Sequence, residues 1–283
     1  MPIPEHEHIE MPEIACLQID AFTDRPFAGN PAAVCLLEEP ADAAWMQAVA
    51  AEMNLSETAF VVPEDGAFGL RWFTPTIEVE LCGHATLAAS HALWAERIIA
   101  LDDPIVFHTK SGVLTCTRDS ERIELDFPAI PLEEIDPPRD LVEALGVTPS
   151  YAGKSRLDHF VFVDAEQTVR SLEPDFAKLR AMPLRGLIVT SPSQSRQFDF
   201  ISRYFAPAAG IDEDPVTGSA HCCLGPFWAE RLGKTELTAF QASARGGTVR
   251  VRVAGERVFL GGNAVTVIRG SLMAEAADSG GHS

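Results

Sequence analysis

The chain has 283 residues, of which 46% are hydrophobic and 22% charged, the composition of an ordinary globular protein. Its formal net charge is −19, and so acidic a surface argues against binding to nucleic acid or anionic membranes. No apolar run approaches the ~20 residues that a membrane span needs, and no signal-like segment is present, so we expect a cytoplasmic protein.

The first part of the chain alternates strand and helix patterns. Apolar and β-branched runs predict strands, and apolar residues at spacings of three and four predict helices. The expected strands are 14–22, 33–37, 58–62, 70–73, 105–109 and 113–117, and the expected helices are 41–53 and 84–98.

The second part repeats this alternation after an acidic, proline-rich linker at 132–138. A helix is predicted at 139–145, between Pro138 and Gly146, the residues that favour a helix start and a helix end. A second helix is predicted at 218–232. The expected strands are 159–163, 187–190, 198–205, 237–242, 248–253 and 257–260.

Three short matches, in the same order, indicate that one unit occurs twice. Segment 71–75 is echoed by 203–207, and segment 94–97 recurs as 228–231. Between these matches, Gly83 aligns with Gly218. Self-similarity of this kind is the mark of a duplicated structural unit.

The two helices that follow the aligned glycines are apolar around most of their circumference, so they should be buried. We therefore predict an α+β protein of two similar halves, each a curved, mostly antiparallel sheet wrapped around a central helix. The N-terminal half is expected at 1–130, completed by a C-terminal strand near 263–271. The C-terminal half is expected at 131–262, and a disordered tail at 273–283.

The aligned glycines are also candidates for substrate binding. A helix that begins at a glycine exposes backbone N–H groups and the positive end of its dipole, which together attract an anion. His84 and Ser219 follow the two glycines, and Asp214 lies just before the second. Taken singly, each of these residues could equally be a helix cap or make a structural hydrogen bond instead of binding substrate.

Four blocks of residues, in order, resemble the phenazine-biosynthesis PhzF-like family of the diaminopimelate-epimerase-like superfamily. The resemblance covers residues 14 to 270. The blocks are 20–31 (with Phe22, Gly29 and Asn30), 55–58 (with Glu57), 73–86 (with Cys82, Gly83 and His84) and 214–220 (with Asp214, Gly218 and Ser219).

The resemblance implies isomerisation without a cofactor or metal, on a small anionic substrate, and a homodimer as the usual assembly. In the family, a carboxylate matching Glu57 shuttles a proton across a dihydro-hydroxyanthranilate ring. The positions matching His84, Asp214 and Ser219 bind and orient that substrate. Our catalytic candidates are Glu57, His84 and Asp214; the substrate-binding candidates are Gly83, Gly218, Ser219 and Asn30.

These residue types suit proton transfer at carbon. Such a reaction needs one group that acts first as base and then as acid, which a carboxyl group partly removed from water can do. Helix N-termini and an imidazole can stabilise the negative charge that develops.

Other functions remain open. Diaminopimelate epimerases and proline racemases use two cysteines, but here Cys82 aligns with Thr217, so an amino-acid epimerase or a dehydratase would depend on Cys82 alone. A non-catalytic small-molecule binding protein is another alternative, which the carboxylate of Glu57 argues against. A zinc protein built from Cys82, His84, His221, Cys222 and Cys223 lacks a usual C-x-x-C pair.

Overall fold

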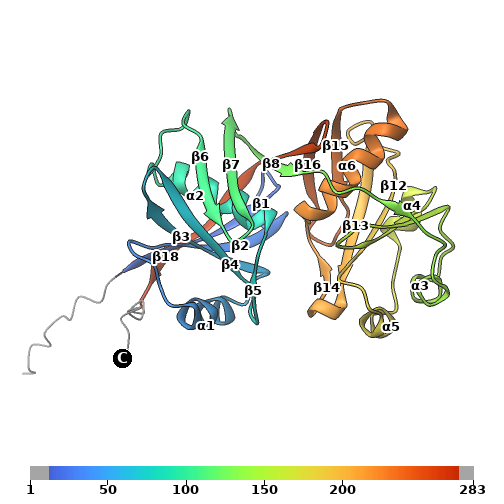
Figure 1. Ribbon diagram of the computed structural model, residues 1–283, viewed down its shortest axis with the longest axis horizontal. Helices are drawn as coiled ribbons and strands as arrows, with labels where there is room; N and C mark the ends of the chain where they lie inside the picture. Colours follow the sequence, from blue (N-terminus) through green and yellow to red (C-terminus); the bar gives the residue numbers. More distant parts are fainter. Residues whose placement is uncertain (1–12, 274–283) are drawn as a thin grey trace, which may run out of the picture.

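The computed structural model describes residues 13–273 and forms two lobes that lie side by side (Figure 1). Each lobe is a curved sheet around one buried helix: α2 (Gly83–Ala95) in the first and α6 (Gly218–Leu232) in the second. In α2, ten of the 13 residues are buried, as expected for a helix without a polar face. The α+β class and the two central helices are therefore confirmed.

The first lobe contains every strand predicted for it, with small differences at the ends. Its helix α1 (Ala43–Met53) packs on the outer face of the sheet. The strands are β1 (Ile14–Ala21), β2 (Asn30–Leu36), β3 (Glu57–Glu64), β4 (Ala67–Phe73), β5 (Glu78–Val79), β6 (Ile105–Thr109), β7 (Gly112–Asp119) and β8 (Arg122–Pro128). Strand β8 was not predicted, although Ile123, Leu125 and Phe127 alternate as buried residues along it.

The second lobe is built in the same way and carries its short helices outside the sheet. These are α3 (Arg139–Leu145), α4 (Glu166–Arg170), α5 (Phe176–Ala181) and the 3₁₀ turn η1 (Pro207–Ala209). The strands are β10 (Tyr151–Lys154), β11 (His159–Phe162), β12 (Leu187–Pro192), β13 (Phe200–Ala206), β14 (Ile211–Asp214), β15 (Glu236–Gln241), β16 (Gly247–Ala254) and β17 (Arg257–Gly262). Of these helices only α3 was predicted; β10 and β14 were also missed.

The strand pairings confirm the duplication. Strand β2 runs parallel to β3, and β11 runs parallel to β12 in the same way. The parallel pair β4 and β6 likewise has its counterpart in β13 and β15. Antiparallel hairpins complete each unit, β6–β7–β8 in one lobe and β15–β16–β17 in the other.

Three pairings join the lobes. Strands β8 and β17, the last hairpin strands of the two units, pair with each other. Strand β9 (Glu133–Glu134) follows the first unit but pairs with β10 of the second, while β18 (Ala264–Leu272) follows the second unit but pairs with β1. Figure 1 shows β8 and β18 running between the lobes. Division of the chain at residue 130 stays a prediction, and residues 274–283 of the expected disordered tail lie outside the described part.

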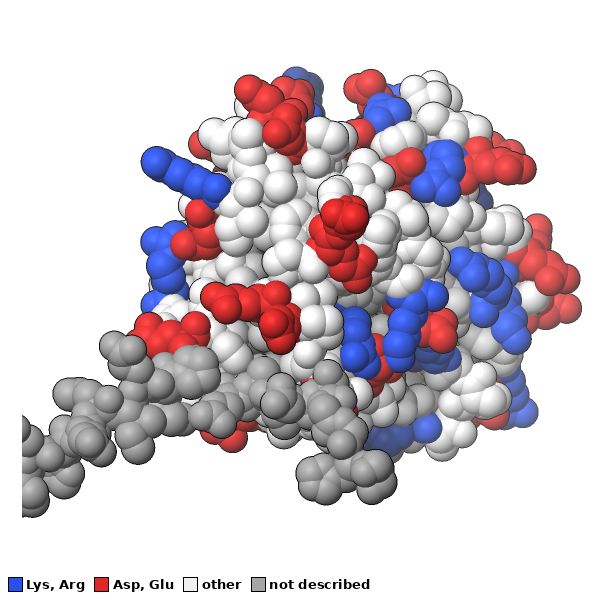
Figure 2. Space-filling view, turned by 60° about the vertical axis from the view of Figure 1, so that its left-hand side comes forward, with Lys and Arg blue, Asp and Glu red and all other residues white. Residues whose placement is uncertain are grey.

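The helices of residues 13–273 include none that is both long and apolar enough to cross a membrane. Acidic side chains are spread over the face of the molecule shown in Figure 2, and basic side chains gather mainly toward its lower right.

The two central helices meet end to end at their first residues. A Cβ atom built on Gly83 would lie 3.2 Å from the Cα of Gly218, and the reverse distance is also 3.2 Å. A side chain at either position would therefore push against backbone. Glycine at both helix starts allows the lobes to approach this closely.

We expect Gly83→Ala to lower the free energy of unfolding by about 1–3 kcal/mol, the usual cost of overpacking. Helix propensity alone favours alanine by about 1 kcal/mol, so a loss of stability would identify the steric contact as its cause. Urea denaturation measures the effect. Gly270→Ala is the control, because its added Cβ would meet no atom within 4 Å; equal stability of the two variants would contradict the prediction.

Candidate functional site

The predicted catalytic residues lie at the ends of secondary-structure elements that meet between the lobes. Asn30 is the first residue of β2 and Glu57 is the first residue of β3. Because these two strands are parallel neighbours, they begin at the same edge of the sheet. Asp214 is the last residue of β14, and His84 lies in the first turn of α2. The fold thus assembles a site from residues up to 184 positions apart.

Glu57 and His84 are in direct contact. The Oε2 atom of Glu57 lies 3.1 Å from Nε2 of His84, and the two side chains are 15% and 4% exposed. Neither atom makes a hydrogen bond of good geometry with another described residue. Buried polar atoms are seldom left in this state, so a polar group of a ligand could complete the bonding of this pair.

Asn30 connects this pair to Asp214. Its side-chain nitrogen donates to Oδ1 of Asp214 (2.8 Å) and to the backbone carbonyl of Val216 (3.0 Å), and lies 3.1 Å from Nδ1 of His84. Its carbonyl oxygen accepts a bond from the hydroxyl of Ser56. Asn30 is fully buried. These contacts fit a residue that positions His84 and Asp214. The substrate-binding role expected for Asn30 from the sequence stays a prediction.

Burial raises the pKa of Asp214 to about 6. The imidazole of His84 opposes this shift, and the carboxylate of Glu57 adds to it. The hydroxyl of Thr217 donates to Oδ2 of Asp214, which stabilises the ionised form. A carboxyl group in this condition can change its protonation state close to neutral pH.

Cys82 and His84 respond differently to their shared surroundings. Burial raises the pKa of Cys82 to about 11, with the charge of Glu57 adding to the shift, so the thiol is neutral at pH 7. Burial alone would lower the pKa of His84, but its neighbours raise it well above the usual value. Because the thiol is neutral, the carboxylate of Glu57 is the partner that supports a protonated imidazole.

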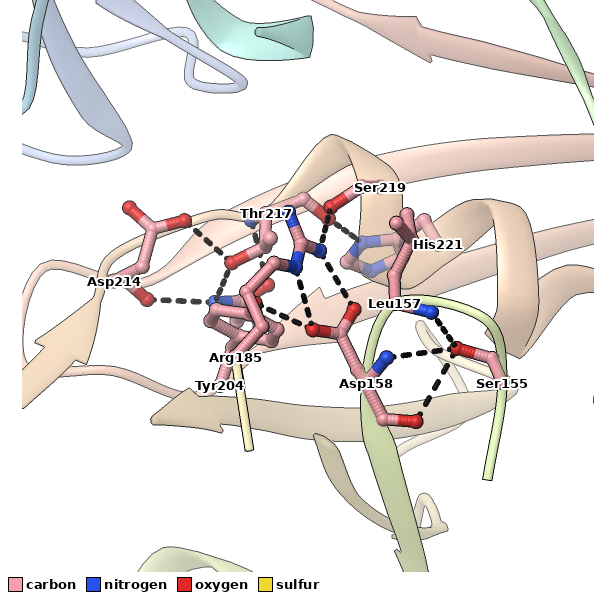
Figure 3. Close-up of polar contacts among 10 residues, drawn as sticks. Ser155, Leu157, Asp158, Arg185, Tyr204, Asp214, Thr217, Ser219 and His221 are labelled. Atoms are coloured by element: carbon pink, nitrogen blue, oxygen red, sulfur yellow. Dashed lines mark hydrogen bonds and ion pairs between the residues drawn. The ribbon is translucent and has the colours of Figure 1, made fainter. Parts of the chain in front are cut away.

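The start of α6 carries a polar network that the sequence analysis missed (Figure 3). Arg185 donates two bonds to the carboxylate of Asp158, at 3.0 and 2.8 Å, and a third to the hydroxyl of Ser219 at 3.2 Å. Tyr204 donates to the same carboxylate. The side chain of Asp158 is 2% exposed, whereas that of Arg185 is 47% exposed. A buried anchor therefore holds an accessible guanidinium group beside Ser219.

This network also reaches the catalytic cluster, because Arg185 lies close enough to Asp214 for their charges to interact. The only feature of the sequence that could have pointed to this network is the repeated segment that contains Tyr204. Nothing near Arg185 in the chain distinguishes it from an ordinary surface arginine.

Three side chains of the site could ligate a metal ion. Glu57, Cys82 and His84 offer ligand atoms that all lie within 4.8 Å of one another. However, the sulfur of Cys82 lies 3.5 Å from Nδ1 of His84, whereas Glu57 faces Nε2 on the other side of the ring. One ion could bind only one nitrogen of the imidazole ring, so it could not use both contacts as they stand.

Neither central helix is capped by a side chain at its start. Cys82 and Thr217 occupy the N-cap positions without a capping hydrogen bond, which leaves backbone N–H groups for an anion. The sequence predicted that Glu57, His84 and Asp214 border one cleft. The structure brings the three together, but neither of the two described cavities is lined by them.

The raised pKa of Asp214 predicts a pH-dependent effect of Asp214→Asn on stability. The folded state favours the protonated carboxyl, so this contribution is present below pH 3.8 and is lost as the pH rises through 6. The variant stays neutral throughout. Between pH 4 and pH 7, the free energy of unfolding of the variant should therefore rise by up to about 3 kcal/mol relative to that of the wild type.

Urea denaturation at the two pH values measures this difference. Asp65→Asn, in the exposed turn after β3, is the control and should show no such change. A stability difference for Asp214→Asn that is constant with pH, or that falls as the pH rises, would contradict the prediction.

Comparisons with known proteins agree with this architecture. The family described as "Phenazine biosynthesis-like protein" matches residues 19–270. An uncharacterised isomerase of Halalkalibacterium halodurans is 54% identical over 256 residues, which cover 90% of this chain and 97% of that protein. A PhzF-family protein of Enterococcus faecalis, solved by crystallography, is 43% identical with a TM-score of 0.88, covering 92% of this chain and 99% of its own.

A predicted epimerase of Pseudomonas aeruginosa shares the fold at 22% identity and a TM-score of 0.69, covering 93% of this chain and 100% of its own. The diaminopimelate-epimerase-like fold expected from the sequence is thus confirmed. The chain belongs to the phenazine biosynthesis-like (PhzF) family.

Proposed function

We propose that this protein is an isomerase that moves a proton on a small, carboxylate-bearing metabolite without a cofactor. The observation that carries the proposal is the contact between Glu57 and His84 beside two uncapped helix starts. It combines an acid–base pair with an anion-binding element in one place. The name of the H. halodurans relative, an isomerase, supports the same reaction class.

Glu57 is the acid–base group in this mechanism. It is the least buried member of its pair with His84, so it is the one that a substrate can reach. It removes a proton from a substrate carbon and returns it to another position, and each transfer leaves it ready for the next. A protonated His84 supports the ionised carboxylate through its Nε2 atom, and its positive charge favours the negative charge that develops on the substrate.

Asp214 and Asn30 keep His84 in place. The chain of contacts from Asp214 through the Asn30 amide to Nδ1 of His84 restricts rotation of the ring. Its Nε2 atom then stays directed at Glu57. Such preorganisation lets the donor act without reorienting during the reaction.

The substrate carboxylate would lie beside the two helix starts, next to the contact of Gly83 with Gly218. The backbone N–H groups and the hydroxyl of Ser219 are suited to bind it, and Arg185 adds a fixed positive charge beside Ser219. An arginine held by a buried carboxylate loses little freedom on binding. A homodimer, which rests on the family resemblance, and the cytoplasmic location expected from the sequence complete the proposal.

Glu57→Gln tests the mechanism. The amide cannot accept and return a proton, so the turnover rate should fall by about 10²–10⁴-fold, with a much smaller effect on substrate affinity. Mass spectrometry of deuterium uptake from heavy water measures this, with dihydro-hydroxyanthranilate among a panel of small carboxylates.

Glu64→Gln, at the exposed end of the same strand, is the matched control and should exchange as the wild type does. Full exchange by the Glu57→Gln variant would eliminate Glu57 as the acid–base group.

The second candidate function is an epimerase that uses Cys82. The residue aligned with Cys82 is Thr217, so a second thiol is missing, and the thiol of Cys82 itself is neutral at pH 7. Cys82→Ala should therefore retain most of the deuterium exchange. If it abolishes exchange while its circular dichroism spectrum stays native, the thiol-dependent epimerase becomes the better assignment.

A further inference from the structure

A second cavity lies where the two lobes meet, apart from the candidate active site. Its volume is about 430 Å³, within the usual range for a small-molecule pocket. Its walls come from the loop after β1, the turn between β15 and β16, and the segment that joins β17 to β18. None of Glu57, His84 and Asp214 lines it.

The charge of this cavity is opposite to that of the chain as a whole. Four arginines line it, together with a single acidic residue, Asp24. Arg245 is already neutralised, because it donates to the buried carboxylate of Asp20 and to the carbonyls of Ala28 and Gly29. The other three (Arg25, Arg122 and Arg250) form no ion pair with a carboxylate of residues 13–273. The cavity is therefore locally positive in a chain of net charge −19.

Two of these arginines lie on strands that flank β17. Arg250 on β16 is directly opposite Gly261 on β17, and Arg122 begins β8 on the other side of β17. A Cβ atom on Gly261 would lie 3.2 Å from Cβ of Arg250 and 3.3 Å from Cδ of Arg122. The missing side chain of Gly261 leaves room for the stem of Arg122 over β17. The guanidinium group of Arg250 donates to the hydroxyl of Thr238 on β15.

We propose that this cavity binds a small molecule through a phosphate or pyrophosphate group. The guanidinium group presents paired N–H donors that match phosphate oxygens. Three uncompensated arginines suit a multiply charged group, whereas a carboxylate supplies a single charge.

Isothermal titration of the full-length protein with inorganic pyrophosphate tests the proposal. The wild type should bind in a saturable, one-site manner. Arg122→Ala and Arg250→Ala should each weaken binding by about tenfold or more, the loss expected for a charge-assisted hydrogen bond. Arg122→Lys and Arg250→Lys keep the positive charge but lose the paired N–H donors of the guanidinium group, so they should weaken binding less than the alanine variants do.

Two variants control for binding elsewhere. Arg139→Ala removes an arginine that is 90% exposed on α3, and Ser219→Ala alters the start of α6; both should bind pyrophosphate as the wild type does. Circular dichroism tests whether each variant is folded. If an alanine variant does not fold, the lysine variant at the same position takes its place.

Several results would overturn the proposal. They are the absence of saturable binding to the wild type, unchanged affinity in all the Arg122 and Arg250 variants, and an equal loss in Arg139→Ala or Ser219→Ala. Citrate provides a final comparison, because tighter binding of citrate than of pyrophosphate would reject phosphate as the recognised group.

Discussion

The close approach of Gly83 and Gly218 is the constraint on which the rest of the site depends. Two helices that meet start to start bring the positive ends of two dipoles together. These ends repel each other unless negative charge lies nearby. Glu57 and Asp214 supply that charge from the edges of the two lobes. The same contact that joins the lobes thus explains why carboxylates are found beside a pair of helix starts.

The two starts are not equivalent, although the repeat makes them superficially alike. The first offers His84, buried and paired with a carboxylate, and suits proton chemistry. The second offers Ser219 beside Arg185, and suits recognition of a fixed negative charge. In the proposed mechanism, the two copies of one helix start would therefore serve different roles, proton transfer at the first and substrate binding at the second.

Much of this could be predicted from the sequence, because the relevant signals are local. The apolar helices and the aligned glycines are patterns within short segments, and Glu57, His84 and Asp214 lie in blocks that resemble a known family. Arg185 and Asp158 were not predicted as part of the site, because their pairing depends on how the second lobe folds around Tyr204. The pairing of β8 with β17 was not predicted either, because its partners are far apart in the chain: Glu124 on β8 is opposite Gly261 on β17.

The pairing of the last strand, β18, with the first strand, β1, has a consequence for how the molecule folds. Strand β1 is made first but lies between β2 and β18, so one of its edges stays open until the last part of the sheet has been synthesised. Closing such a distant contact carries a large entropic cost and slows folding. An exposed strand edge also invites pairing with other chains in the meantime. Rapid completion of the sheet therefore shortens the time in which the open edge of β1 can pair with another chain.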